Sequence, residues 1–235
     1  QSRTGSSLAL LAASESRYPA ALQAYDPYQH LLNPPTPPGV YHYFFERRGL
    51  PFFVIDTRTE RKKGHEMLNF AQMDTLKRWL LKSRGKPVRF IASNVPFFPD
   101  EYDVGDGWGS CARQRGELLE FIRAEKIGPV IFLGGAAHAA SVSEMPCEND
   151  PEFYAASVVS SPLFWPYGFG KQSGYRKRAV FEHDESRFEY KMRTFVGANN
   201  YVALSVSADP KAGIGVQIWG TQGELLETAQ LKLFA

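Results

Sequence analysis

Cysteine is scarce in this sequence, and long apolar runs are absent. Only two of the 235 residues are cysteines, Cys111 and Cys147, which is too few for a disulfide framework or a zinc ribbon. We expect both to be free thiols, with pairing in an oxidising compartment as the alternative. No run is long and apolar enough to cross a bilayer. The short apolar stretch Leu8–Ala13 is expected to be a loop or frayed end and not a signal peptide, so nothing indicates a cellular location.

An excess of one charge is also missing. The chain has 27 basic and 25 acidic residues, a formal net charge of +2, so neither nucleic acid nor an anionic membrane is indicated as a partner. The G-x-S-x-G, Walker and dinucleotide-binding motifs do not occur. What is present is an ordinary globular composition, with 43% hydrophobic residues, in a chain long enough to bury a sizeable core.

The first forty residues differ from the rest of the chain. Tyr18–Leu32 carries spaced apolar residues and predicts one or two short helices broken at Pro27. A run of four prolines follows within residues 33–39, and this stiff connector cannot join a helix or a sheet. We therefore expect a helical segment with a Pro-rich connector at 1–39, and one larger domain at 40–235.

The larger domain is expected to have an α/β core. Two aromatic and β-branched runs around Glu46-Arg47-Arg48-Gly49 predict a hairpin. Phe70–Leu81 and Arg115–Ala124 have apolar residues at helical spacing. Solid apolar strands alternate with these helices, which indicates a sheet covered by helices. The expected strands are Phe52–Ile55, Val88–Val95 and Val130–Leu133.

The end of the chain is expected to finish this sheet system in antiparallel strands. Four runs separated by turn residues read as successive strands. These runs are Phe188–Val196, Tyr201–Ser207, Ile214–Trp219 and Leu225–Leu233.

Several motifs, in a shared order, resemble those of PhoD-like phosphatases. Phe52–Arg61 resembles the family's "FFVLDTRxxR" strand, and Phe90–Phe97 its "FIxSSVPF" strand and loop. Val130–His138 is similar to "VVFLSGDVH". Further matching segments are Met67–Met73 with Trp79-Leu80, Asp106–Leu119, Val159–Leu163 and Asn199-Asn200-Tyr201.

This resemblance implies a metallophosphoesterase-like layered fold and phosphoester hydrolysis assisted by metal ions, with Ca, Fe and Mn as candidates. A phosphoester small molecule or a lipid headgroup is the implied substrate. The matching segments correspond to the later half of such an enzyme, whose first metal ligands lie on earlier strands. Because the chain begins at Gln1, we expect those ligands on a missing N-terminal segment or subunit.

The resemblance also implies candidate site residues. The family's late metal motif is "G-D-x-H", and here it reads Gly135-Ala136-Ala137-His138, so the acidic position is an alanine without a lone pair. His138 is the candidate catalytic residue and metal ligand, Asp56 a further metal ligand, and Asn94 a second catalytic candidate. A packing or structural role is the alternative for each.

Four more residues are candidates for substrate binding. Arg58 and Arg61 follow the Phe52–Ile55 strand, and a guanidinium group suits phosphate. Trp108 and Arg115 are associated with a Gly-rich stretch that could lie over the mouth of a site. The alternative for Arg58 and Arg61 is a structural ion pair. The alternative for Trp108 and Arg115 is a surface loop fixed by one buried indole.

Two function classes therefore stay open. The first is a phosphoester hydrolase, incomplete or degenerate because its early metal ligands are lacking. The second is a catalytically silent metallophosphoesterase-like module for binding or structure, which Ala136 favours. A nucleophile and base formed by Cys111 and His138 is a poorer arrangement, because no orienting third group accompanies them.

Overall fold

The computed structural model of the chain describes residues 18–62, 64–101, 106–146, 150, 152–164, 174–207, 209 and 212–231. The Leu8–Ala13 segment and Cys147 lie outside these residues. The chain divides into two compact units, Gln1–Tyr43 and Phe44–Ala235, and each is described by itself.

The first unit contains a helix and a connector. The helix covers residues 18–28 and is followed by the short 3₁₀-helix η1 (His30–Leu32). It ends one residue after Pro27, close to the predicted break, since proline lacks the N–H of an intrahelical hydrogen bond and its ring crowds the preceding turn. The connector contains no helix or strand, and His30 Nε2 lies 2.8 Å from Thr36 Oγ1 across it.

The second unit is built on an eight-stranded sheet with the order β1-β2-β3-β4-β6-β5-β8-β7. Strands β2, β3, β4 and β6 are parallel, and β5, β8 and β7 continue the sheet in antiparallel pairs. The strands are β1 (Tyr43–Arg47), β2 (Leu50–Val54), β3 (Arg89–Ala92), β4 (Val130–Gly134), β5 (Ala140–Pro146), β6 (Tyr154–Val159), β7 (Arg178–His183) and β8 (Ser186–Val196).

The predicted hairpin is formed by β1 and β2. Its turn consists of Arg48 and Gly49, both with positive φ, 51° and 81°. Two left-handed residues match the twist of the flanking strands, so this short turn fixes their register. The expected strands around 52–55, 88–95 and 130–133 are confirmed as β2, β3 and β4.

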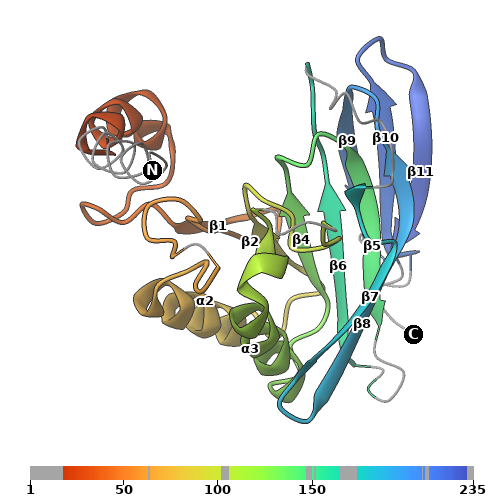
Figure 1. The fold of residues 1–235 in the computed structure, drawn as a ribbon, viewed down its shortest axis with the longest axis horizontal. Coiled ribbons are helices and arrows are strands. Elements are labelled where there is room, and N and C mark those ends of the chain that lie inside the picture. The colour runs from red at the N-terminus through yellow and green to blue at the C-terminus, as the bar shows by residue number, and fades with distance from the viewer. Residues whose placement is uncertain are drawn as a thin grey trace, which may run out of the picture. The chain divides into compact units, whose positions relative to one another are not determined.

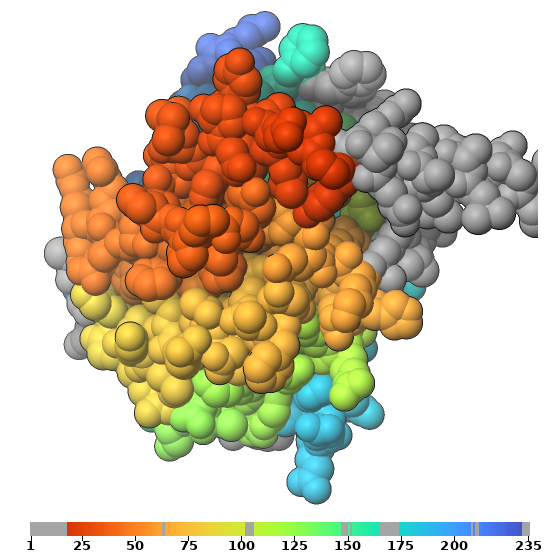
Figure 2. Space-filling view, turned by 90° about the vertical axis from the view of Figure 1, so that its left-hand side faces the viewer, coloured from red at the N-terminus to blue at the C-terminus, as the bar shows by residue number. Residues whose placement is uncertain are grey.

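Two helices cover one face of the sheet, as the sequence predicts. Helix α2 (Phe70–Lys82) begins at Asn69, whose side chain accepts a hydrogen bond from the Gln72 N–H and caps the first turn. Helix α3 (Ala112–Ala124) follows the 3₁₀-helix η2 (Trp108–Cys111). Figure 2 shows α2 in gold and α3 in green on the same face, with the cyan tip of the β7–β8 hairpin beside them.

The remaining strands do not continue the large sheet. Strands β9 (Asn200–Val206), β10 (Ile214–Gly220) and β11 (Leu225–Leu231) form a separate antiparallel sheet in the order β11-β10-β9. It packs on the face opposite the helices, where Ile214, Val216 and Ile218 share one core with Phe90 and Ile131 of the large sheet. The result is three layers, with helices, a large sheet and a small sheet (Figure 1).

Alternating side chains separate the two cores. Phe53, Ile91 and Phe132 face the helices, whereas Phe90 and Ile131 face the small sheet. Each central strand is thus apolar on both faces, as expected for a covered parallel sheet. Within the described residues, none of the helices has the length and apolar character needed to span a membrane.

Candidate active site

The carboxyl ends of β2, β3, β4 and β6 meet at one edge of the large sheet, which we call the carboxyl edge. Parallel pairing extends past the strands: the Ile55 N–H donates to Ala92 O at 2.9 Å, and the Ser93 N–H to Leu133 O at 2.8 Å. These bonds bring the segments after each strand side by side, the usual place for a site in a parallel sheet. Asp56, Asn94 and His138 all lie in these segments.

A hydrogen bond joins the first two of these segments. The hydroxyl group of Thr57 donates to Oδ1 of Asn94. Thr57 is buried, whereas Asn94 is exposed at the end of β3. The bond fixes the orientation of the Asn94 amide from the protein interior and leaves the side chain accessible to solvent.

His138 lies in a strained loop after β4. Both Ala136 and His138 have left-handed backbone conformations, with φ of 54° and 52°, which are uncommon for residues other than glycine. The His138 N–H donates to Ser161 Oγ at 3.2 Å, and the Tyr175 hydroxyl donates to Ala137 O at 2.8 Å. The loop is therefore held from two sides, with the His138 side chain half-buried and Ala136 exposed.

Asp56 forms the turn that follows β2. Its Oδ1 accepts hydrogen bonds from the N–H groups of Arg58 and Thr59, at 2.9 and 3.1 Å, and the Thr59 hydroxyl donates to Oδ2. Partial burial and, second, the charge of Asp56 raise the pKa of Glu60. The carboxylate of Asp56 thus already has three donors, which is the arrangement of a turn residue.

The two arginines of this turn differ in their surroundings. Arg58 is exposed. The side chain of Arg61 is only 8% exposed, and its Nη2 lies 3.4 Å from Asp106 Oδ1 and 3.5 Å from Ser110 Oγ. Its buried Nε has no hydrogen-bond partner among the described residues. A buried guanidinium with one long ion pair retains capacity to bind an anion.

Trp108 and Arg115 lie inside the protein. Trp108 is fully buried, with Nε1 3.4 Å from Ser93 Oγ. Arg115 is 2% exposed and binds the Asp100 carboxylate with two nitrogen atoms, at 2.5 and 3.1 Å. Its Nη1 also donates to Phe97 O at 3.2 Å, and its guanidinium lies over the Phe181 ring. These contacts fasten the loop after β3 and leave neither side chain facing solvent.

The donor atoms at the carboxyl edge do not fit a two-metal centre. No three His, Cys, Asp or Glu side chains lie close enough to hold a metal ion in the part of the chain that the structure describes. Ala136 supplies no ligand atom, and the Asp56 carboxylate is engaged in its turn. Hard divalent cations need several oxygen ligands, so we derive no step through a metal from these residues.

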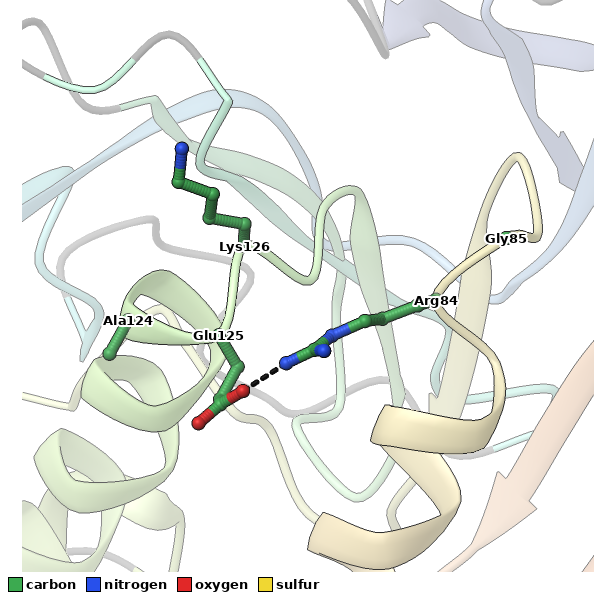
Figure 3. A pocket seen from close by; sticks show the side chains of 5 residues that line it. All are labelled: Arg84, Gly85, Ala124, Glu125 and Lys126. Atoms are coloured by element: carbon green, nitrogen blue, oxygen red, sulfur yellow. Dashed lines mark hydrogen bonds and ion pairs between the residues drawn. The ribbon is translucent and has the colours of Figure 1, made fainter.

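A hollow lies at the opposite edge, where α2 and α3 end before β3 and β4 begin. It is lined by Arg84, Gly85, Ala124, Glu125 and Lys126. In Figure 3 the side chains of Arg84 and Glu125 point toward each other as an ion pair, and Lys126 points away. The one carboxylate in this hollow is ion-paired with Arg84, and we assign the hollow no part in phosphoester chemistry.

The roles of several residues at the carboxyl edge could not be predicted from the sequence. Thr57 and Ser161 lie within family-like motifs, next to Asp56 and in the Ser-Ser-Pro segment, but nothing in the sequence indicates which strand end each would join. Asn200 is fully buried, and its side chain donates to Ser161 O at 2.8 Å, which anchors the small sheet beside the edge. Tyr175 has no signal in the sequence.

Comparison with known proteins identifies the family. A profile of PhoD-like phosphatases matches residues 10–209. The chain belongs to the PhoD-like phosphatase family. This PhoD-like chain matches no curated protein.

Two solved structures resemble this PhoD-like chain. A purple acid phosphatase from yellow lupin (Lupinus luteus) seeds has a TM-score of 0.50 at 10% identity, over 86% of this chain and 34% of that one. A structure of PhoD has a TM-score of 0.43 at 14% identity, over 86% of this chain and 46% of the other. The first supports the fold alone. The PhoD-like chain thus spans less than half the length of either structure.

Proposed function

We propose that this PhoD-like protein takes part in the hydrolysis of a phosphoester at the carboxyl edge of its large sheet. The observation that carries the proposal is the meeting of Asp56, Asn94 and His138 at one edge, in a chain of a phosphatase family. The substrate class is a phosphoester small molecule or a lipid headgroup, and both monoesters and diesters fit it.

The residues have different roles in this proposal. The Asn94 amide, oriented by Thr57, binds a phosphoryl oxygen, and the His138 imidazole binds the phosphoryl group or exchanges a proton with the reacting oxygen. Arg58 and Arg61 offset phosphate charge, Arg58 from the surface and Arg61 through its buried guanidinium. Trp108 and Arg115 support the loop after β3 and are not assigned a substrate contact.

Metal dependence requires groups beyond those described. The family resemblance implies Ca, Fe or Mn, with His138 and Asp56 as the candidate ligands on this chain; the turn already engages the Asp56 carboxylate, so His138 is the ligand that we propose first. Because these residues do not suffice for a two-metal centre, the proposal calls for additional polypeptide, either a preceding segment or a separate subunit, that supplies further carboxylates.

A second function is favoured by one observation. Ala136 is exposed at the position where the family motif has an acid. A catalytically silent module for binding or structure would have no need of that acid. The two proposals differ in whether phosphoesters are turned over.

Turnover measurements test the proposal. For the 235-residue chain alone, we expect background hydrolysis of p-nitrophenyl phosphate and bis(p-nitrophenyl) phosphate, with or without Ca²⁺, Fe or Mn²⁺. For the protein purified from its native source with any accompanying polypeptide, we expect metal-dependent turnover. Robust metal-dependent turnover by the isolated chain would contradict the incomplete-site reading, and no turnover by the native species would favour the silent module.

A further inference from the structure

One peptide unit in the loop after β4 is held at both of its polar groups. It joins Ala137 to His138, so the Ala137 C=O and the His138 N–H belong to it. The Tyr175 hydroxyl donates to the C=O at 2.8 Å, and the N–H donates to Ser161 Oγ at 3.2 Å. In a planar trans peptide these two groups point in opposite directions, so the two bonds together fix the orientation of the plane.

The orientation of this plane determines the backbone conformation of His138. Rotating the plane changes φ of His138, which is 52° and therefore left-handed. A residue with a Cβ atom keeps this unfavourable conformation only where its surroundings fix it. The direction in which the imidazole leaves the peptide plane depends on φ, so the two hydrogen bonds also determine where the His138 side chain points.

Tyr175 is itself anchored to the segment that follows β3. It forms an antiparallel bridge with Glu101, and the N–H of the next residue, Arg176, donates to Asp100 O at 2.8 Å. The Tyr175 hydroxyl also lies 3.4 Å from Glu101 Oε1. Arg115 in turn holds the Asp100 carboxylate with two nitrogen atoms. The position of the hydroxyl therefore depends on the buried ion pair between Arg115 and Asp100.

The ring and the hydroxyl of Tyr175 have separate contacts. The ring lies beside Phe195 of β8, with 6.0 Å between the ring centroids, and this packing does not need the phenolic oxygen. The hydroxyl instead reaches the carbonyl next to His138, at a distance typical of an O–H···O hydrogen bond. Phenylalanine would therefore keep the packing and lose only the contact with the loop that carries His138.

We infer that Tyr175 is a positioning residue of the carboxyl edge, which acts through the peptide before His138 and orients the imidazole. The inference rests on the proposed function, because that proposal gives the imidazole its contact with the phosphoryl group. Tyr175 has no substrate contact of its own in this role. A displacement of about 1 Å in a reacting group can cost roughly 100-fold in rate, so the loss of one hydroxyl that fixes His138 is sufficient to impair turnover.

Nuclear magnetic resonance of the 235-residue chain tests the orienting contact without any substrate. In Tyr175→Phe we expect the His138 amide to exchange at least about fivefold faster, and the coupling between its amide and α protons, which reports φ, to change. Tyr154→Phe is the matched control, because it also removes a bonded phenolic hydroxyl, the donor to Glu144 Oε1 at 2.6 Å. It is expected to change neither quantity at His138. Equal results for the two variants would overturn the inference.

A double-mutant cycle on the native species tests the link to catalysis. With bis(p-nitrophenyl) phosphate, Tyr175→Phe is expected to lower kcat/KM by about 10- to 100-fold when His138 is present. In the His138→Ala background the same change is expected to have no further effect, because the side chain that it orients is already gone. An equal loss in both backgrounds would show a merely structural role and overturn the inference. Because exchange and coupling are measured without substrate, absence of turnover in every variant would contradict only the proposed function.

Discussion

The Thr57 hydroxyl group donates a hydrogen bond to the side-chain oxygen of Asn94, and this bond connects the segments after β2 and β3. Thr57 is buried and Asn94 is exposed, so the bond links the core to the candidate site. A buried residue thus fixes the orientation of an exposed side chain at the carboxyl edge.

Replacing Thr57 by valine is expected to lower the free energy of unfolding by about 1 kcal/mol. Valine keeps the shape but loses the hydroxyl, and a neutral hydrogen bond contributes about that amount. Urea unfolding is the measurement. Thr75→Val is the control, because the Thr75 hydroxyl bonds to Ala71 O on an exposed helix surface and its loss is expected to change stability by less than about 0.5 kcal/mol.

Replacing Arg115 by methionine is expected to destabilise the fold by about 3–5 kcal/mol. The change leaves the Asp100 carboxylate without its partner in a mostly buried place, which is the costly way to break a buried ion pair. Arg58→Met, at an exposed position, is expected to lie within about 0.5 kcal/mol of the wild type. A small effect at Arg115 would contradict the structural role derived from its contacts.

Ala136→Gly is expected to leave the free energy of unfolding unchanged or to raise it by up to about 1 kcal/mol. The left-handed conformation at φ 54° is unfavourable for alanine and not for glycine, whereas glycine gains entropy in the unfolded chain. The same substitution in a helix, Ala71→Gly, is expected to be destabilising. Thermal unfolding of both variants tests this expectation. A loss of about 1 kcal/mol or more in the free energy of unfolding of Ala136→Gly would contradict backbone strain at Ala136.

The contact between α3 and the β7–β8 hairpin is expected to depend on pH. Burial by itself would raise the pKa of Glu120, but hydrogen bonds from Arg123 and Ser186 and the charges of Arg123 and His183 outweigh it and lower the pKa below 4.5. A carboxylate with a lowered folded-state pKa stabilises the fold above its unfolded pKa, and this stability is lost as the pH falls through the folded value.

Glu120→Gln is therefore expected to lose less stability than the wild type between about pH 6 and about pH 3. Urea unfolding at both pH values measures this difference. Glu185→Gln, at an exposed position of the β7–β8 turn, is the control. An identical acid-range loss in the wild type and Glu120→Gln would contradict the ionic contact.

The helices and three of the four parallel strands, β2, β3 and β4, were predictable from the sequence because their signals are local. The Arg48-Gly49 turn and the apolar runs of β2, β3 and β4 need no information from distant residues. Strands β5, β6 and β7 were missed. In β5 and β6 small alanine and serine side chains fill the middle of the sheet, so the β-branched pattern is weak there.

The separate small sheet could not be predicted, because turn signals show where strands end and not which sheet they join. The burial of Arg115, by contrast, could have been predicted from the sequence. It lies three, four and seven residues before Leu118, Leu119 and Ile122, on the buried stripe of α3. The partner Asp100 lies in a loop outside that helix, and this long-range pairing is what the sequence alone does not indicate.

The most direct test of the proposed hydrolysis is the effect of His138→Ala on kcat/KM for bis(p-nitrophenyl) phosphate, measured on the native species. If the imidazole contacts the phosphoryl group or transfers a proton, its loss should lower kcat/KM by roughly 100-fold or more. His65→Ala, at an exposed position to which the proposal assigns no substrate contact, should stay within about twofold of the wild type. A value for His138→Ala that equals that of His65→Ala would contradict the assignment of the carboxyl edge as the active site.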